Sequence, residues 1–196
     1  MIEDDGGRGD TVKGASGQWR PHPVDSASTT WGSGDYPAMA GLLEPAALAA
    51  VAAAADGPHD RVLDVATGTG NAALLAAERG AQTSGIDFEP ALLRRAEQRA
   101  SADGREVRWL TGDVQALPVP DDSADVVLSV FGVMYATDHA AAAREPARVA
   151  APCARVVLAS LCPAACCLRW VRCSAPTYRS RPPAAGRPAG GAIQSP

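Results

Sequence analysis

Residues 61–71 read RVLDVATGTGN, and this stretch decides the fold because it describes a buried strand that runs into a glycine turn. Asp64 interrupts an otherwise apolar run, at a place where a parallel strand is normally apolar throughout. Gly68 and Gly70 can adopt backbone angles closed to other residues, and they let a ligand approach the main chain closely. The next segment, Ala72–Arg79, has the composition of a helix. Strand, turn and helix together predict a nucleotide-type pocket.

The charge of the strand indicates which nucleotide fits. GTGNAA also satisfies the loose dinucleotide pattern G-x-G-x-x-G/A, with Asp87 as the acid further along the chain. A dinucleotide brings a doubly negative pyrophosphate, which the Asp64 carboxylate would repel, whereas the ammonium and sulfonium of S-adenosylmethionine would be attracted. A P-loop is disfavoured because no lysine follows the glycines. The residues therefore favour S-adenosylmethionine, with a nicotinamide dinucleotide as the open alternative.

Strand and helix patterns alternate along the rest of the chain. The expected strands are Arg61–Val65, Gln82–Asp87, a third at Val107–Thr111 or Glu106–Leu110, Ala124–Val130 and Arg155–Ser160. The expected helices are Pro45–Ala55, Ala72–Arg79, Ala91–Ala102 and His139–Val149. Such alternation implies parallel pairing with right-handed crossovers. We predict an α/β fold, a doubly wound and mostly parallel Rossmann-like sheet with helices on both faces.

Further acids follow the next strands, where open parallel sheets bind ligands. A carboxylate at Asp87 can accept both hydroxyls of a ribose. Asp113 and Val114 follow the third strand, where an acid or its backbone can hold an adenine amino group. Each acid also has a structural reading, since Asp64 can cap backbone amides, Asp87 can cap the next helix and Asp113 can form an ordinary turn.

Several motifs in order resemble those of the class I S-adenosylmethionine-dependent methyltransferases, particularly the ubiquinone and menaquinone biosynthesis branch with its type 11 or type 25 methyltransferase domain. The motifs are RVLDVATGTGN, GIDFEP, GDVQALPVPDDSADVVLSVFGVMYA and ARVVLAS. WGSGDYPAMAGLLEP, residues 31–45, resembles the helix that precedes the first strand in that branch. The resemblance covers about residues 31–160, and spaced motifs are far more specific than one glycine turn.

The resemblance implies a cofactor role for particular residues. Asp64 is implied near the methionine ammonium, Asp87 at the ribose, Asp113 with Val114 at the adenine, and Ser129 beneath the reacting centre. The full set expected to bind S-adenosylmethionine is Asp64, Ala66, Gly68, Thr69, Gly70, Asp87, Phe88, Asp113, Val114 and Ser129. No metal is expected, and proximity and orientation can supply the acceleration without a dedicated catalytic residue.

The predicted function is methyl transfer to a small-molecule acceptor, by O- or C-methylation of a compound such as a quinol. A truncated, non-catalytic remnant that binds S-adenosylmethionine is the main alternative, and a nicotinamide-dependent oxidoreductase is the third. Asp138 and His139 follow the fourth strand, so either is a candidate base, although Asp138 also fits as the cap of the next helix.

Composition bounds the class of protein. The 196 residues are 46% apolar, enough for one domain with a sizeable core. Residues 1–150 carry 12 basic and all 22 acidic side chains, which argues against extended nucleic-acid contact. The first residues, MIEDDGGRGD, lack the basic and then apolar pattern of a secretory signal, and no apolar run is long enough for a membrane span. We expect a cytoplasmic protein.

The two ends differ from the middle. Residues 1–30 are expected to be mobile, residues 31–160 to form the methyltransferase domain, and residues 161–196 to be irregular. The tail has six prolines and no Asp, Glu or Lys, and APCAR at 151–155 replaces the Pro-Gly-Gly turn of the family. We hypothesise a frameshift or truncation near residue 161 that removes the last two strands of the family pattern.

All five cysteines follow residue 152: Cys153, Cys162, Cys166, Cys167 and Cys173. They form no C-x-x-C pair, and no histidine accompanies them, so incidental thiols are a better interpretation than zinc or disulfides.

Overall fold

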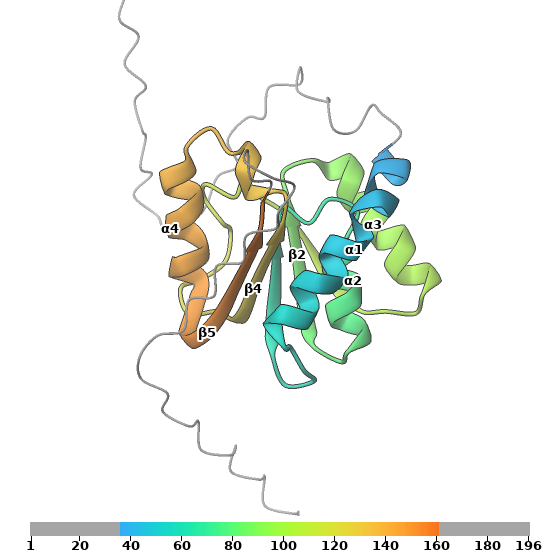
Figure 1. Ribbon diagram of the computed structural model, residues 1–196, viewed down its shortest axis with the longest axis horizontal. Helices are drawn as coiled ribbons and strands as arrows, with labels where there is room; N and C mark the ends of the chain where they lie inside the picture. Colours follow the sequence, from blue (N-terminus) through green and yellow to red (C-terminus); the bar gives the residue numbers. More distant parts are fainter. Residues whose placement is uncertain (1–35, 161–196) are drawn as a thin grey trace, which may run out of the picture.

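The computed structural model describes residues 36–160, with side chains from Met39 onward, as a parallel sheet flanked by helices (Figure 1). The strands are β1 (Arg61–Val65), β2 (Gln82–Asp87), β3 (Val107–Thr111), β4 (Ala124–Val130) and β5 (Ala150–Ala159). The helices are α1 (Tyr36–Ala54), α2 (Asn71–Glu78), α3 (Pro90–Ala102) and α4 (His139–Val149), with a 3-10 turn η1 (Val133–Tyr135). The strand order is β3-β2-β1-β4-β5 and every pair is parallel. The predicted doubly wound α/β fold is confirmed.

The expectations for residues 1–30, for the tail 161–196 with its four cysteines and for two further strands fall outside the described residues. None of the helices in residues 36–160 combines the length and the apolar composition that a membrane crossing requires.

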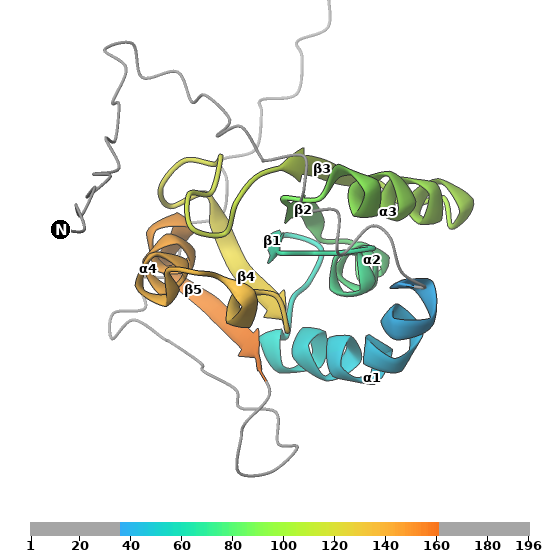
Figure 2. The same ribbon diagram turned by 90° about the horizontal axis from the view of Figure 1, so that it is seen from above.

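Helices cover both faces of the sheet (Figure 2). On one face, alanines of α1 and α2 pack with Val62, Val126 and Leu128, while α3 lies on the same side across β2 and β3. On the other face, Val149 of α4 packs with Leu63 and other strand residues. Neighbouring residues of a strand point to opposite faces, so a sheet covered on both sides needs a continuous apolar run. That requirement makes the buried Asp64 conspicuous.

Two glycines make room for the indole of Trp109 in β3. A Cβ atom at Gly85 would lie 2.5 Å from Trp109 Cζ3, and one at Gly70 would lie 2.7 Å from Trp109 Cη2. Gly70 also has φ 84°, in the left-handed region that favours glycine. The side chain of Trp109 therefore supports the glycine turn from the adjacent part of the sheet.

The first helix is longer than predicted. We expected it at Pro45–Ala55, but α1 runs from Tyr36 to Ala54 with Pro45 inside it. Proline lacks the amide that would bond to the Gly41 carbonyl, which normally ends or kinks a helix. Here both residues lie on the exposed side, while Ala46 and Ala47 are buried against the core. Burial of the opposite face outweighs the missing bond.

The fifth strand also differs from the prediction of Arg155–Ser160, because β5 begins at Ala150. Ala150 pairs with Ala124 and Arg155 pairs with Val126, so β5 advances five residues while β4 advances two. Cys153 has φ 69° in this irregular stretch. A bulge accommodates the extra residues and tolerates Pro152, which has no amide to donate.

Candidate functional site

Two adjoining cavities lie at the carboxyl ends of β1, β2 and β4. The larger one, of about 340 Å³, is mostly apolar and is lined by Met39, Leu43, Ala66, Asp87, Phe88, Leu92, Val130, Phe131, Gly132 and Tyr135. The smaller one, of about 30 Å³, separates α1 from the glycine turn and is lined by Ala40, Leu43, Asp64, Ala66, Thr67, Thr69, Asn71, Ala72 and Val130. A wider groove of about 730 Å³ lies at the opposite edge, among the amino ends of the strands. The predicted acids Asp64 and Asp87 thus reach the adjoining pair.

Asp64 is buried at 2% exposure beside the glycine turn. Its Oδ2 accepts hydrogen bonds from Thr67 Oγ1 at 2.6 Å and from the Ala73 amide at 3.1 Å. Burial raises the pKa of Asp64 to about 7; the Thr67 hydroxyl and the Ala73 amide oppose that rise, and the charge of Asp87 adds to it. Asp64 therefore holds one amide near the start of α2 and also lines the smaller cavity, and its role at the methionine ammonium stays a prediction.

Asp87 fastens the glycine turn to the end of β2. Its Oδ2 accepts from the Gly68 amide at 2.8 Å, and its Oδ1 accepts from the Glu89 amide at 2.9 Å. Glu89, rather than Asp87, is the N-cap of α3, because its carboxylate accepts from the Ala91 amide at 3.0 Å. Burial raises the pKa of Asp87, against the effect of the Glu89 and Gly68 amides. Asp87 faces the larger cavity with both oxygens already fixed in place.

The amides of the glycine turn are used within the chain. The Gly68 amide bonds to Asp87, the Thr67 amide to the Ile86 carbonyl at 2.9 Å, and the Gly70 amide to the Thr67 carbonyl at 2.9 Å. A phosphate cradle needs several amides that point together at the anion. This turn, with buried carboxyls on both sides, suits a ligand without phosphate.

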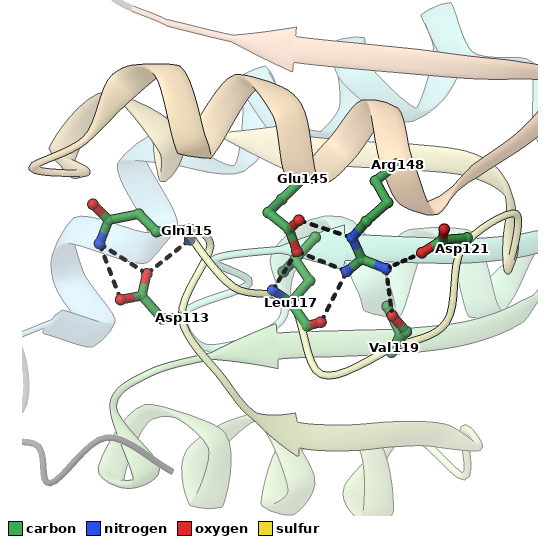
Figure 3. A network of polar contacts seen from close by, with 7 residues as sticks. All are labelled: Asp113, Gln115, Leu117, Val119, Asp121, Glu145 and Arg148. Atoms are coloured by element: carbon green, nitrogen blue, oxygen red, sulfur yellow. Dashed lines mark hydrogen bonds and ion pairs between the residues drawn. The ribbon is translucent and has the colours of Figure 1, made fainter. Parts of the chain in front are cut away.

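The segment after β3 is a turn rather than a wall of either cavity. The exposed Asp113 accepts from the Gln115 amide at 2.9 Å and from Gln115 Nε2 at 3.0 Å (Figure 3). Gln115 Oε1 in turn accepts from the Asp138 amide at 2.6 Å. Val114 packs against the core cluster on the α4 face. The structure does not bring Asp113 or Val114 among the cavity-lining residues, and their adenine role stays a prediction.

Ser129 is fully buried in β4. Its hydroxyl donates to the Val65 carbonyl at 2.7 Å and ties β4 to the end of β1. Its predicted place beneath the reacting centre stays a prediction, and neither cavity includes it. The sequence reasoning missed several lining residues, which in the larger cavity are Met39, Leu43, Leu92, Val130, Phe131, Gly132 and Tyr135, and in the smaller one also Ala40, Thr67, Asn71 and Ala72. The only sequence signal for Met39 and Leu43 was the resemblance of residues 31–45 to a preceding helix.

The β3–β4 segment is anchored to α4 by one arginine (Figure 3). Arg148 donates to the carbonyls of Leu117 and Val119, each at 3.0 Å, and pairs with Asp121 and Glu145 at 2.7 Å. Glu145 Oε2 also accepts from the Leu117 amide at 2.7 Å. The hydrogen bond from Arg148 lowers the pKa of Glu145. This network fixes a loop whose preceding turn carries Asp113.

Asp138 caps α4, as one of the two readings proposed. Its Oδ1 accepts from the Ala141 amide at 2.9 Å, and His139, the first residue of the helix, is exposed. Within residues 36–160, no group of three His, Cys, Asp or Glu side chains could hold a metal ion.

Comparisons with known proteins bear on the family of the chain. Residues 62–153 match the family described as a methyltransferase domain, a range that runs from the glycine-turn strand into β5. The predicted resemblance to the S-adenosylmethionine-dependent methyltransferases is therefore confirmed over these residues. S-adenosylmethionine is the methyl donor in that family, so the cofactor expectation is confirmed.

The methyltransferase domain resembles both curated proteins and solved structures. An uncharacterised protein of Mycobacterium tuberculosis is 46% identical over 123 residues, which is 62% of this chain and 45% of that protein. The demethylmenaquinone methyltransferase of Thermus thermophilus is 46% identical over 100 residues, covering 50% of this chain and 46% of that protein. A putative methyltransferase of Haloferax volcanii, solved with a methyltransferase activator, superposes with a TM-score of 0.61 at 28% identity, covering 66% and 58%. The chain spans about half the length of the curated relatives it matches.

Proposed function

We propose that this methyltransferase domain moves the methyl group of S-adenosylmethionine to a small apolar acceptor. The observation that carries the proposal is the larger cavity, whose apolar walls adjoin a buried carboxylate, Asp87. Met39 and Tyr135 line this cavity and are 52% and 57% exposed, so apolar groups also reach its mouth. A cavity of this kind suits the adenosine part of the donor, with its polar ribose and flat base, together with an apolar acceptor.

Particular residues would hold the donor. Asp64, beside the glycine turn, would as a carboxylate attract the ammonium or sulfonium of the donor. Asp87 accepts the Gly68 amide at Oδ2 and the Glu89 amide at Oδ1, and a carboxylate has further lone pairs that could accept a ribose hydroxyl. Phe88 and Leu92 offer apolar contact to a base. The turn at Asp113 and Val114 remains the proposed adenine contact, by resemblance to the family.

The chemistry asks little of the side chains. When bound, S-adenosylmethionine would supply an electrophilic methyl group: an acceptor oxygen or carbon would take the methyl and lose its proton to solvent, and the sulfur–carbon bond electrons would stay on sulfur. Apolar walls around Val130 and Phe131 exclude water from the reacting atoms. The domain would then act mainly through proximity and orientation, without a base of its own.

The residues that line the larger cavity indicate the class of acceptor. Leu43, Phe131 and Tyr135 offer apolar and aromatic contact near the donor, which fits a flat aromatic acceptor such as a quinol. The demethylmenaquinone methyltransferases among the relatives support the same class. O- or C-methylation of a quinol-like compound is therefore our specific proposal.

The test is direct. The chain is titrated with S-adenosylhomocysteine by calorimetry and then assayed for transfer of a labelled methyl group to reduced naphthoquinones. Binding with turnover supports the proposal, and binding without turnover supports the alternative that this chain is a non-catalytic binding module. Binding of NADH in place of S-adenosylhomocysteine would overturn both readings in favour of the oxidoreductase, against which the internally bonded turn amides argue.

A further inference from the structure

Arg99 of α3 reaches back to the glycine turn. Its Nη1 lies 2.7 Å from the Thr69 carbonyl oxygen, 3.2 Å from Thr69 Oγ1 and 2.7 Å from Asn71 Oδ1. Asn71, the first residue of α2, donates from Nδ2 to the Ala40 carbonyl of α1 at 2.7 Å. One chain of hydrogen bonds therefore runs from α3 through the turn to α1. It joins three elements that are distant in the sequence.

The position of α1 affects the shape of the site because residues of this helix line both cavities. Ala40 and Leu43 line the smaller cavity opposite Asp64, and Met39 and Leu43 line the larger one. Pro45 has no amide to donate to the preceding turn, so the amino half of α1 is held to the rest of the helix by one bond fewer. The hydrogen bond from Asn71 to the Ala40 carbonyl can therefore hold the amino half of α1 in position.

We propose that Arg99 is a positioning residue for the cofactor: it fixes the glycine turn and, through Asn71, latches α1 over the site. The inference rests on the proposed function, since it concerns the same cofactor site. Arg99 does not line the two cavities and acts through Thr69 and Asn71. Charge-assisted hydrogen bonds from a guanidinium are stronger than neutral ones.

The first test compares two arginines on the same helix in the full chain. Arg99→Leu should raise the Kd for S-adenosylhomocysteine about tenfold, the effect of losing a charge-assisted hydrogen-bond set. Arg94→Leu removes the same charge from an exposed position with no described bond to the turn, and should change Kd less than about twofold. Arg99→Lys should recover part of the loss, because a single nitrogen of Arg99 makes all three contacts. Equal affinity of Arg99→Leu and the unchanged protein would overturn the proposal.

A second measurement separates the latch from general stability. Without ligand, Arg99→Leu and Asn71→Ala should both speed hydrogen exchange in the amino half of α1 and leave the unfolding midpoint nearly unchanged. The Kd of the double variant should be no higher than that of the single variant with the larger loss of affinity, because the effects of residues that act as one unit are not additive. Additive losses would show that the chain does not act as a unit. If the unchanged protein does not bind S-adenosylhomocysteine, the proposed function fails. The hydrogen-exchange experiment still tests whether Arg99 and Asn71 hold the amino half of α1 in place.

Discussion

Gly132 packs directly against Ala66 where the loops after β4 and β1 meet. A Cβ atom at position 132 would lie 2.3 Å from Ala66 Cβ and 3.1 Å from its carbonyl oxygen. Ala66 itself has φ 55°, a left-handed conformation that costs a residue with a side chain about 1–2 kcal/mol. Both residues line the larger cavity, so this contact sets the shape of its wall.

The contact predicts a coupled pair of substitutions. Gly132→Ala should lower the free energy of unfolding by about 1–3 kcal/mol, the usual cost of overpacking. Ala66→Gly should recover part of that loss, because it removes the nearest clashing atom and the strain at position 66. Urea unfolding of both single variants and the double variant measures the coupling. Gly41→Ala is the control, since nothing lies within 4 Å of its Cβ, and it should stabilise α1 by about 0.5–1 kcal/mol. A Gly132→Ala protein as stable as its parent would contradict the contact.

Asp64 should make stability depend on pH. Its pKa is about 7 when folded and near 3.8 when unfolded, so between these values the folded state holds a proton that the unfolded state has released. The free energy of unfolding should therefore fall as pH rises from about 4 to about 7, by up to about 4 kcal/mol, and level off above. Asp64→Asn should flatten most of this slope, with Asp87 leaving a remainder of the same sign. Urea unfolding at several pH values measures it.

The matched control for Asp64 is Glu97→Gln on the exposed face of α3, which should keep the slope of the unchanged protein. A bound cation favours the carboxylate, so the affinity for S-adenosylhomocysteine should rise as pH increases through about 7. An unchanged slope in Asp64→Asn would argue that this carboxyl ionises normally.

Asp87 is predicted to recognise the ribose. The unchanged protein should bind 2′-deoxy-S-adenosylhomocysteine at least about tenfold more weakly than the normal ligand, because a buried acceptor loses its partner. Asp87→Asn should bind both ligands with similar, weaker affinity. Because Asp87 also holds the Gly68 and Glu89 amides, unfolding of the variant is measured in parallel. If Asp87→Asn still discriminates between the ligands, another residue reads the ribose.

Arg148 is predicted to hold the β3–β4 segment in place. Arg148→Ala should lower the free energy of unfolding by about 2 kcal/mol and speed hydrogen exchange of the Leu117 amide, because it breaks contacts with two carbonyls and two carboxylates. Arg144→Ala, an exposed neighbour on α4, should have little effect. Exchange mass spectrometry and urea unfolding check both variants.

The ion pair between Arg148 and Glu145 should also make the free energy of unfolding depend on pH. The pKa of Glu145 is lowered in the folded state, so its stabilising contribution is complete above the unfolded value of 4.5 and is lost as pH falls through the folded value. The difference between Arg148→Ala and the unchanged protein should therefore shrink as pH falls below 4.5. A constant difference across this range would mean that the carboxylate contributes little.

The strand and helix pattern was readable from the sequence wherever local signals agreed. The bounds of β1, β2, β4 and α4 match the prediction to the residue, because apolar runs, caps and glycines mark their ends. The pattern failed at Pro45 and at Ala150. There, burial of one helix face and pairing of a bulged strand with β4 overrode local rules that treat proline as a breaker.

The sequence by itself determined the order of the elements and the chemistry of the turn, because an acid inside an apolar strand followed by glycines is a local signal. Only the tertiary structure decided what surrounds that turn. Asp87 and Arg99 reach the glycine turn through crossovers of the chain, and Asn71 at the end of the turn donates a hydrogen bond to α1. Such contacts depend on how parallel strands and their helices stack in space, and no spacing along the chain records that.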